Sequence, residues 1–335
     1  MVTANPVPVR ASPEIRLDRI QHPYGPCPAA LEASALPSDV SVSELTQRLR
    51  HRLAGLYHVT PGAILLFGGA DVAMRRILDP LAGRLVKFPP SASASWIERQ
   101  WPGRQAISVA RGIAAHSSLE PDIAADLPAN AVAVIDSPSD PLGSLLRPAD
   151  AVRIARACQW LVVDERFAEF GGQSLLSLAL EFDNIVVIRS FETWAGLNVF
   201  PCAWAVVPQR IATTLASCDL TLQSEAIVPA LVTLDNLAAV EATLRLVREE
   251  RSRLYRLLRK LSFIDPVPSW GPFLAARVGF GKRDELVARL GERGIRVHAP
   301  DQAGLADFVR FGIGPRSSME RLRQVLLELA PLLVA

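Results

Sequence analysis

Lysine is scarce in this sequence, and neither sign of charge dominates it. The 335 residues include 36 Lys and Arg against 34 Asp and Glu, which leaves a formal charge of +2, and the only lysines are Lys87, Lys260 and Lys282. A nucleic-acid binder needs a concentrated basic face to hold phosphates, whereas these arginines are dispersed through segments with helical spacing. No helix-turn-helix segment precedes the main pattern. We therefore expect no nucleic-acid partner.

Long apolar runs, metal-ligand spacings and cysteine pairs are also absent. No run of about 18 or more uninterrupted apolar residues could span a bilayer, and the proline-rich N-terminus lacks the apolar core of a signal peptide. The cysteines show no CxxC or Cys/His spacing and indicate reduced core thiols: Cys27, Cys158, Cys202 and Cys218. The five histidines also lack ligand spacing. These absences predict a cytoplasmic protein without a metal site or a membrane partner.

Short apolar runs alternate with helix-like segments from about residue 41 onward. The runs are rich in β-branched residues and apolar nearly throughout, as in strands buried on both faces of a parallel sheet. They are "AILLF", "RLVKF", "QAISVA", "NAVAVID", "WLVVDE", "NIVVIRSF" and "CAWAVV". This pattern predicts an α/β fold with a mostly parallel central sheet, helices on both faces, and functional residues at the carboxyl ends of the strands.

Three parts of the chain are expected from these patterns. Residues 1–38 form an arm interrupted by prolines, residues 39–228 form the large domain, and residues 229–335 form a connecting helix and a smaller α+β domain. The connecting segment, "LVTLDNLAAVEATLRLVREERSRLYRLLRKL", is expected to be one long helix.

Segments at the expected strand ends occur in an order that resembles one family. They are "HPYGPCPAALEA", "GGADVAMRRIL", "DSPSDPLGSLL", "VVDERFAEF", "RSFETWAGLNVFPCAWAVV" and "FVRFGIG". Over nearly the whole chain they resemble the fold-type I aminotransferases that use pyridoxal phosphate (PLP), in the branch of histidinol-phosphate aminotransferase and threonine-phosphate decarboxylase. The resemblance implies the fold-type I architecture and a homodimer, because the family's site is shared across a two-fold axis.

Several positions keep the chemistry that this resemblance implies. Gly69, Ala70 and Asp71 match the strand-to-helix turn whose backbone N–H groups hold the cofactor phosphate. Asp164 matches the carboxylate that pairs with the pyridine nitrogen, and Tyr24 matches a tyrosine that reaches the phosphate from the partner subunit. Each position also has a purely structural alternative. The glycine turn could be an ordinary turn that opens a helix, Asp164 could cap the next turn, and Tyr24 could pack on proline.

Two further positions match substrate contacts of the family. Arg310 corresponds to the arginine that holds a substrate carboxylate bidentately, a role suited to a guanidinium. His298 stands at the position of the arginine that binds a substrate phosphate, with Arg296 close by in sequence.

The loop that carries the family's catalytic lysine departs from the pattern. Aligned on Ser190 and the following Gly-Leu pair, the lysine falls at Thr193, the loop serine at Glu192 and the phosphate-binding arginine at Pro201. Thr193 cannot form an imine with an aldehyde, because that reaction needs an amine. Glu192 and Pro201 replace a hydroxyl and a cation with an anion and a ring without N–H, which opposes a phosphate dianion. Lys87 is the alternative source of an amine.

The remaining departures concern groups around the cofactor ring. Asp140 replaces the asparagine of an Asn-Pro-x-Gly turn, and its carboxylate only accepts hydrogen bonds. Phe167 replaces the tyrosine that serves the cofactor's phenolate oxygen. Ala92 or Ser95 replaces the stacking aromatic, unless Trp96 takes that place.

These substitutions predict an aminotransferase-like protein with a degenerate cofactor pocket, repurposed for another small-molecule reaction or for binding. The candidate catalytic residues are Thr193, Glu192 and Asp140, the cofactor-site positions are Gly69, Ala70, Asp71, Asp164, Phe167, Ser190 and Tyr24, and the substrate contacts are Arg310 and His298. We expect no cofactor, a PLP-independent pseudoenzyme, and a ligand with a carboxylate or an amine. Two alternatives stay open: a genuine PLP-dependent aminotransferase or amino-acid decarboxylase with an atypical site, and a non-catalytic dimeric partner or regulator.

Overall fold

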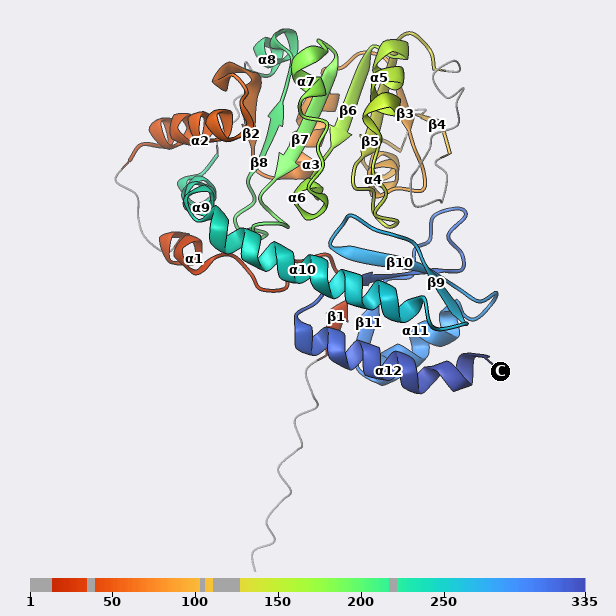
Figure 1. Ribbon diagram of the computed structural model, residues 1–335. Helices are drawn as coiled ribbons and strands as arrows, with labels where there is room; N and C mark the ends of the chain where they lie inside the picture. The colour runs from red at the N-terminus through yellow and green to blue at the C-terminus, as the bar shows by residue number, and fades with distance from the viewer. Residues whose placement is uncertain (1–13, 35–39, 103–105, 111–126, 217–221, 335) are drawn as a thin grey trace, which may run out of the picture.

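A seven-stranded sheet forms the centre of the larger part of the molecule (Figure 1). The computed structural model describes residues 14–34, 40–102, 106–110, 127–216 and 222–334. The strands lie in the order β2 (Ile64–Phe67), β8 (Ala203–Val206), β7 (Ile185–Ser190), β6 (Trp160–Asp164), β5 (Ala131–Asp136), β3 (Arg84–Lys87) and β4 (Ala106–Ser108). Strands β3 to β7 pair in parallel, whereas β8 is antiparallel to both of its neighbours. The predicted α/β fold with a mostly parallel sheet is confirmed.

Helices cover both faces of this sheet, so each inner strand is buried on two sides. Successive residues of a strand point to opposite faces; Val162 belongs to one hydrophobic core and Val163 to the other. One face is covered by α3 (Ala70–Leu78), α4 (Ala92–Gln100) and α8 (Gln209–Ala216). The other is covered by α2 (Val42–Tyr57), α5 (Pro148–Ala157), α6 (Ala168–Gly171), α7 (Leu178–Glu181) and α9 (Ser224–Asp235). This two-sided burial explains why the strands are apolar throughout and do not alternate with polar residues.

A smaller sheet lies beside the long helix α10 (Leu237–Leu258), which runs along the lower side of the larger part (Figure 1). Its antiparallel strands follow the order β12 (Phe308–Gly312), β10 (Phe273–Val278) and β9 (Ile264–Pro266). Helices α11 (Arg283–Glu292) and α12 (Arg316–Val334) complete this part. Near the N-terminus, β1 (Ile15–Leu17) pairs in parallel with β11 (Ile295–Val297), and α1 (Pro28–Ser34) follows. Of the expected arm, residues 1–13 and 35–38 lie outside the described residues.

The connecting segment is two helices, not the single helix predicted from the sequence. Helices α9 and α10 meet at an angle of 84°. At the break, the side-chain amide of Asn236 donates to the carbonyl of Val232 at 2.8 Å, a local bond with which Asn competes with helix continuation. Among the described residues, no single helix has the length and apolar composition to cross a membrane, and the α9–α10 pair reaches that threshold only when its two helices are counted together.

Candidate functional site

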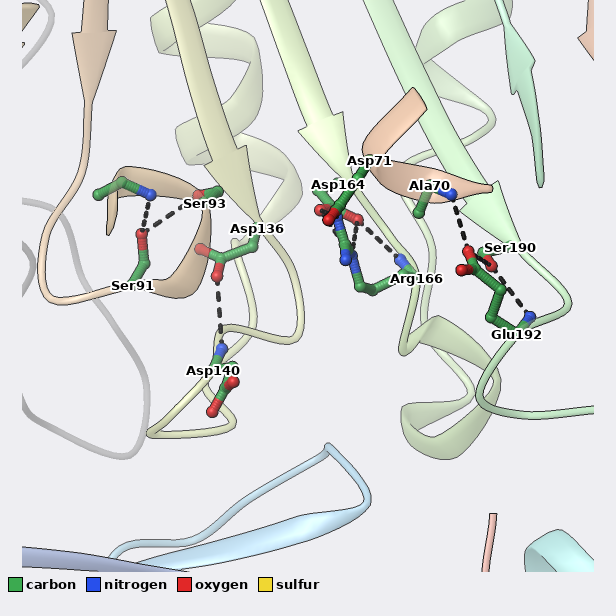
Figure 2. A network of polar contacts seen from close by, with 11 residues as sticks. Ala70, Asp71, Ser91, Ser93, Asp136, Asp140, Asp164, Arg166, Ser190 and Glu192 are labelled. Carbon is green, nitrogen blue, oxygen red and sulfur yellow. Dashed lines mark hydrogen bonds and ion pairs between the residues drawn. The ribbon is translucent and has the colours of Figure 1, made fainter. Parts of the chain in front are cut away.

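The candidate site is a cavity of about 140 Å³ at the carboxyl ends of β5 and β6, beside the N-terminal ends of α3 and α4. Its lining includes Asp71, Trp96, Asp136, Asp140 and Arg166. Parallel strands bring their carboxyl ends to one edge of the sheet, which is where ligands bind in open α/β sheets. Figure 2 shows these strand ends and the polar side chains that converge there.

Arg166 lies at one side of the cavity and forms ion pairs with two carboxylates. Its Nε lies 2.8 Å from Oδ2 of Asp164, and its Nη2 lies 2.9 Å from Oδ1 of Asp71 (Figure 2). Burial lowers the pKa of Arg166, but the charges of Asp164 and Asp71 outweigh that effect and raise it above its ordinary value. Asp164 is only 3% exposed, so this guanidinium supplies the cation that a buried carboxylate requires.

Glu192 engages the first turn of α3. The backbone N–H of Ala70 donates to Oε2 of Glu192 at 2.7 Å, and the hydroxyl of Ser190 donates to the same oxygen at 2.6 Å (Figure 2). Gly69 permits this approach, because its φ is +116° and a Cβ there would lie 3.3 Å from Oε1 of Glu192. A carboxylate at a helix N-terminus is stabilised by free N–H groups and the helix dipole. Glu192 therefore occupies the anion-binding position of this turn.

Arg310 on β12 and His298, which follows β11, lie side by side in an isolated antiparallel bridge. The backbone N–H of Arg310 donates to the carbonyl of His298 at 2.8 Å, and the reverse bond is 3.1 Å. Burial and the charge of Arg310 lower the pKa of His298. Arg296 lies elsewhere: its Nε donates to Oε1 of the exposed Glu14 at 2.6 Å. The resemblance thus pairs two residues that the structure brings together.

The Arg310 guanidinium is buried and incompletely bonded. It is 4% exposed, and its Nη2 donates to the carbonyl of Asp18 at 2.8 Å. Its Nη1 lies 3.5 Å from Oδ1 of Asp140. Within the described part of the chain, Nε and Nη1 of Arg310 and Oδ1 of Asp140 have no hydrogen-bond partner. Asp140 is therefore the carboxylate with which Arg310 forms an ion pair.

No lysine amine among the described residues lines the cavity. Thr193 is buried, with 8% exposed. Lys87, the expected alternative, forms an ion pair with Glu98 on α4, and Lys282 donates to the carbonyl of Leu333 at the C-terminal end of α12, at 2.8 Å. Within the described ranges, the cavity lining therefore offers no amine that could form an imine with an aldehyde.

Of the residues considered for stacking on the cofactor ring, some line the cavity and one does not. Ala92, Trp96 and Phe167 line the cavity, so Trp96 supplies an aromatic side chain there. Ser95 instead lies 3.5 Å from the side-chain nitrogen of Gln302. Tyr24 is 38% exposed and is not among the described residues that line the cavity.

A second charged cluster lies on the opposite face of the sheet from Asp164. Arg189 Nε is 3.3 Å from Oε2 of Glu165, and its Nη1 is 3.4 Å from Oε1 of Glu169. The guanidinium also stacks 5.1 Å from the ring centre of Tyr57. Burial raises the pKa of Glu169 to about 7 and that of Tyr57 to about 12. One guanidinium thus serves two buried carboxylates behind the candidate site.

Sequence reasoning missed Arg166, although a cation two residues after a strand-end aspartate was a usable signal. Arg166 and Arg99 both line the cavity beside its carboxylates. Within the described residues, no group of three or more His, Cys, Asp or Glu side chains is placed to hold a metal ion.

The parallel sheet with its antiparallel β8, the glycine turn that opens α3, and the buried strand-end Asp164 together define a protein of the fold-type I aminotransferase class. Comparison with known proteins agrees. The family model "Aminotransferase class I and II" matches residues 100–327. The chain belongs to this family.

Three relatives illustrate how far the similarity extends. Histidinol-phosphate aminotransferase of Roseiflexus castenholzii is 28% identical over 341 residues, which cover 94% of this chain and 90% of the relative. The structure of the Clostridium acetobutylicum histidinol-phosphate aminotransferase aligns with a TM-score of 0.84 at 18% identity, over 95% of this chain and 100% of that one. The Sinorhizobium meliloti histidinol-phosphate aminotransferase, solved in complex with pyridoxal-5′-phosphate, aligns with a TM-score of 0.82 at 20% identity, over 95% of this chain and 91% of that one.

These comparisons correct two expectations from the sequence. The expectation that no cofactor is involved is wrong for this family, since a neighbour with the same fold was solved with PLP bound. The designation as a PLP-independent pseudoenzyme is wrong for the same reason, and the aminotransferase alternative is the better supported one. PLP is therefore the cofactor that the family implies for this site.

The side chains in the arrangement described do not fit PLP. At the α3 turn, the cofactor phosphate would meet the carboxylate of Glu192, a group of like charge. At Asp164, a protonated ring nitrogen would meet the guanidinium of Arg166, again of like charge. Thr193 offers a hydroxyl where imine formation requires an amine. The backbone positions of the family's site are retained. The groups that would contact the cofactor are instead paired with side chains of this chain: the α3 turn with Glu192 and Asp164 with Arg166.

Proposed function

We propose that this aminotransferase-family protein binds a small molecule that carries a carboxylate and an amine, such as a small amino acid, at the strand-end cavity. The observation that carries the proposal is the incomplete bonding of Arg310 beside Asp140. A buried guanidinium whose Nε and Nη1 have no hydrogen-bond partner is costly, and a ligand carboxylate is the acceptor that forms the strongest hydrogen bonds with such a cation. Oδ1 of Asp140, which has an ion pair with Arg310 but no hydrogen bond among the described residues, is an acceptor for an ammonium group.

The size of the cavity favours a small ligand. Its volume of about 140 Å³ is below the range of roughly 300–1,000 Å³ typical of sites for drug-sized molecules. Asp140 lines this cavity, so a ligand amine bound there remains near the strand ends. We propose that the chain carries out no imine step at Thr193, because a hydroxyl cannot supply the nitrogen.

Titration of the full-length protein with a panel of unphosphorylated amino acids and dicarboxylates tests this proposal by calorimetry. Arg310→Gln should weaken the binding of the best ligand by roughly 10- to 100-fold, which corresponds to one charge-assisted hydrogen-bonded pair. Arg296→Gln is the matched control, because Arg296 is an exposed arginine of the same part of the chain. If no member of the panel binds, or if Arg310→Gln binds as tightly as the wild type, the proposal fails.

A second candidate function is PLP-dependent aminotransfer with an atypical site, supported by relatives named as aminotransferases across 94% of the chain. Its test is a PLP absorbance spectrum followed by borohydride reduction and peptide mapping. A PLP-modified Lys87, Lys260 or Lys282 supports this candidate. Amino-acid binding without any such adduct supports the first. We also propose a homodimer, from the resemblance alone, which analytical ultracentrifugation tests.

A further inference from the structure

Two opposite charges in this site are already matched by side chains of the chain itself. The first turn of α3, where N–H groups favour an anion, is engaged by the carboxylate of Glu192 at 2.7 Å from the Ala70 nitrogen. The buried carboxylate of Asp164, which requires a cation, is engaged by the guanidinium of Arg166 at 2.7 Å. The first contact joins residues 122 positions apart in the chain, and the second joins residues two positions apart.

The Glu192 contact is more than a surface hydrogen bond. The same carboxylate oxygen accepts from Ser190, and the Ser190 hydroxyl accepts from the backbone N–H of Glu192 at 3.0 Å. The carboxylate also lies against Gly69, so little room remains between it and the backbone. A second anion could reach the Ala70 nitrogen only after this carboxylate left.

The Arg166 contact is equally well anchored. Its guanidinium binds both oxygens of Asp164, at 3.1 and 2.8 Å from Nε, and extends to Asp71 on α3. Figure 2 shows Arg166 and Glu192 on either side of the start of α3, approaching it from β6 and β7. Asp71 therefore ties the arginine to the same helix whose first turn Glu192 occupies.

We propose that Glu192 and Arg166 are tethered internal ligands that close an anion subsite and a cation subsite at this edge of the sheet. A phosphate-bearing ligand must displace Glu192 from α3, and a ligand with a cationic ring must displace Arg166 from Asp164. The pair thus sets specificity against phosphorylated molecules. This inference concerns subsites separate from Arg310 and holds whether or not the amino-acid ligand proposed above is correct.

The test uses the full-length protein with inorganic phosphate and PLP as probes, both measured by calorimetry. Glu192→Ser should bind phosphate at least about tenfold more tightly than the wild type, because the like charge is gone, or show a measurable dissociation constant where the wild type has none. Arg166→Ala should leave phosphate binding unchanged and strengthen PLP binding, and the double variant should bind PLP most tightly. Glu225→Ser is the matched control, since it removes an exposed carboxylate from the first turn of another helix, α9.

The outcomes are distinguishable from a folding defect and from failure of the proposed function. Circular dichroism and a thermal melt identify variants that remain folded, and Glu192→Gln keeps the side-chain volume if Glu192→Ser does not fold. A folded Glu192→Gln or Glu192→Ser protein that binds phosphate no better than the wild type overturns the proposal. Equal gains in Glu225→Ser also overturn it, because the effect would then be one of net charge. The unphosphorylated amino-acid panel at Arg310 addresses a different contact and fails or succeeds independently.

Discussion

Replacing Glu169 with glutamine should remove a large part of the pH dependence of folding stability between about pH 5 and about pH 8. Both carboxylate oxygens of Glu169 are buried without a hydrogen-bond partner among the described residues. Arg189, the nearby cation, is shared with Glu165. Because burial disfavours the charged form more than this shared guanidinium favours it, the pKa of Glu169 rises to about 7.

The sign and size of the effect follow from proton linkage. The carboxyl group of Glu169 binds its proton more tightly in the folded protein than in the unfolded chain, where its pKa is near 4.5. Its contribution to the free energy of unfolding is therefore fully present below about pH 4.5 and is lost as the pH rises through about 7. One pKa unit corresponds to about 1.4 kcal/mol, so the full loss is roughly 3 kcal/mol. A glutamine has no proton to lose and shows no such decrease.

Urea unfolding of both proteins at several pH values, followed by tryptophan fluorescence, measures this difference. Between about pH 5 and about pH 8 the wild type should lose roughly 3 kcal/mol more than Glu169→Gln. Other titrating groups, such as His22, contribute equally to both proteins and cancel. Glu181→Gln serves as the control, because Glu181 is exposed on α7. Identical pH slopes for the wild type and Glu169→Gln would refute the reasoning.

Three further predictions concern the core and the loop at the candidate site. Arg189→Met leaves two buried carboxylates without their cation and should lower the free energy of unfolding at neutral pH by about 3–5 kcal/mol in urea titrations; a loss below about 1 kcal/mol would contradict it. Gly196 has a φ of +72°, and a Cβ there would lie 2.5 Å from the Pro26 nitrogen. Gly196→Ala should therefore lower the Tm by several degrees in calorimetry. An unchanged Tm would count against this geometry. Burial raises the pKa of the thiols of Cys158 and Cys202 to about 12, so peptide mapping should find both unmodified after iodoacetamide treatment of the native protein; rapid alkylation of either would disprove it.

The fold could be predicted because its signals are local. Each buried strand appears in the sequence as a short apolar run, and the order of strand-end motifs carries the family resemblance. The antiparallel direction of β8 could not be predicted in this way, because an apolar run has no direction. The break at Asn236 was also missed, because the helical pattern continues on both sides of it and the side-chain bond from Asn236 to Val232 leaves no periodic signal in the sequence.

The candidate site was only partly predictable. The absence of an amine at Thr193 follows from the sequence, because residue identity alone decides whether an imine can form. The side-by-side placement of Arg310 and His298 agrees with the resemblance. The role of Arg166 as the partner of both Asp164 and Asp71 was not foreseen, because Asp71 lies 95 residues away in the chain.

The sequence by itself determined the layered architecture and the chemical limits of the site, since periodicity and residue type are properties of each segment. Tertiary structure alone decided which charges meet. Glu192 lies 122 residues from Ala70 in sequence, yet its carboxylate binds the first turn of α3. Electrostatic and hydrogen-bond energies depend on distances of a few ångströms, and those distances exist only once the parallel strands have brought their carboxyl ends to one edge of the sheet.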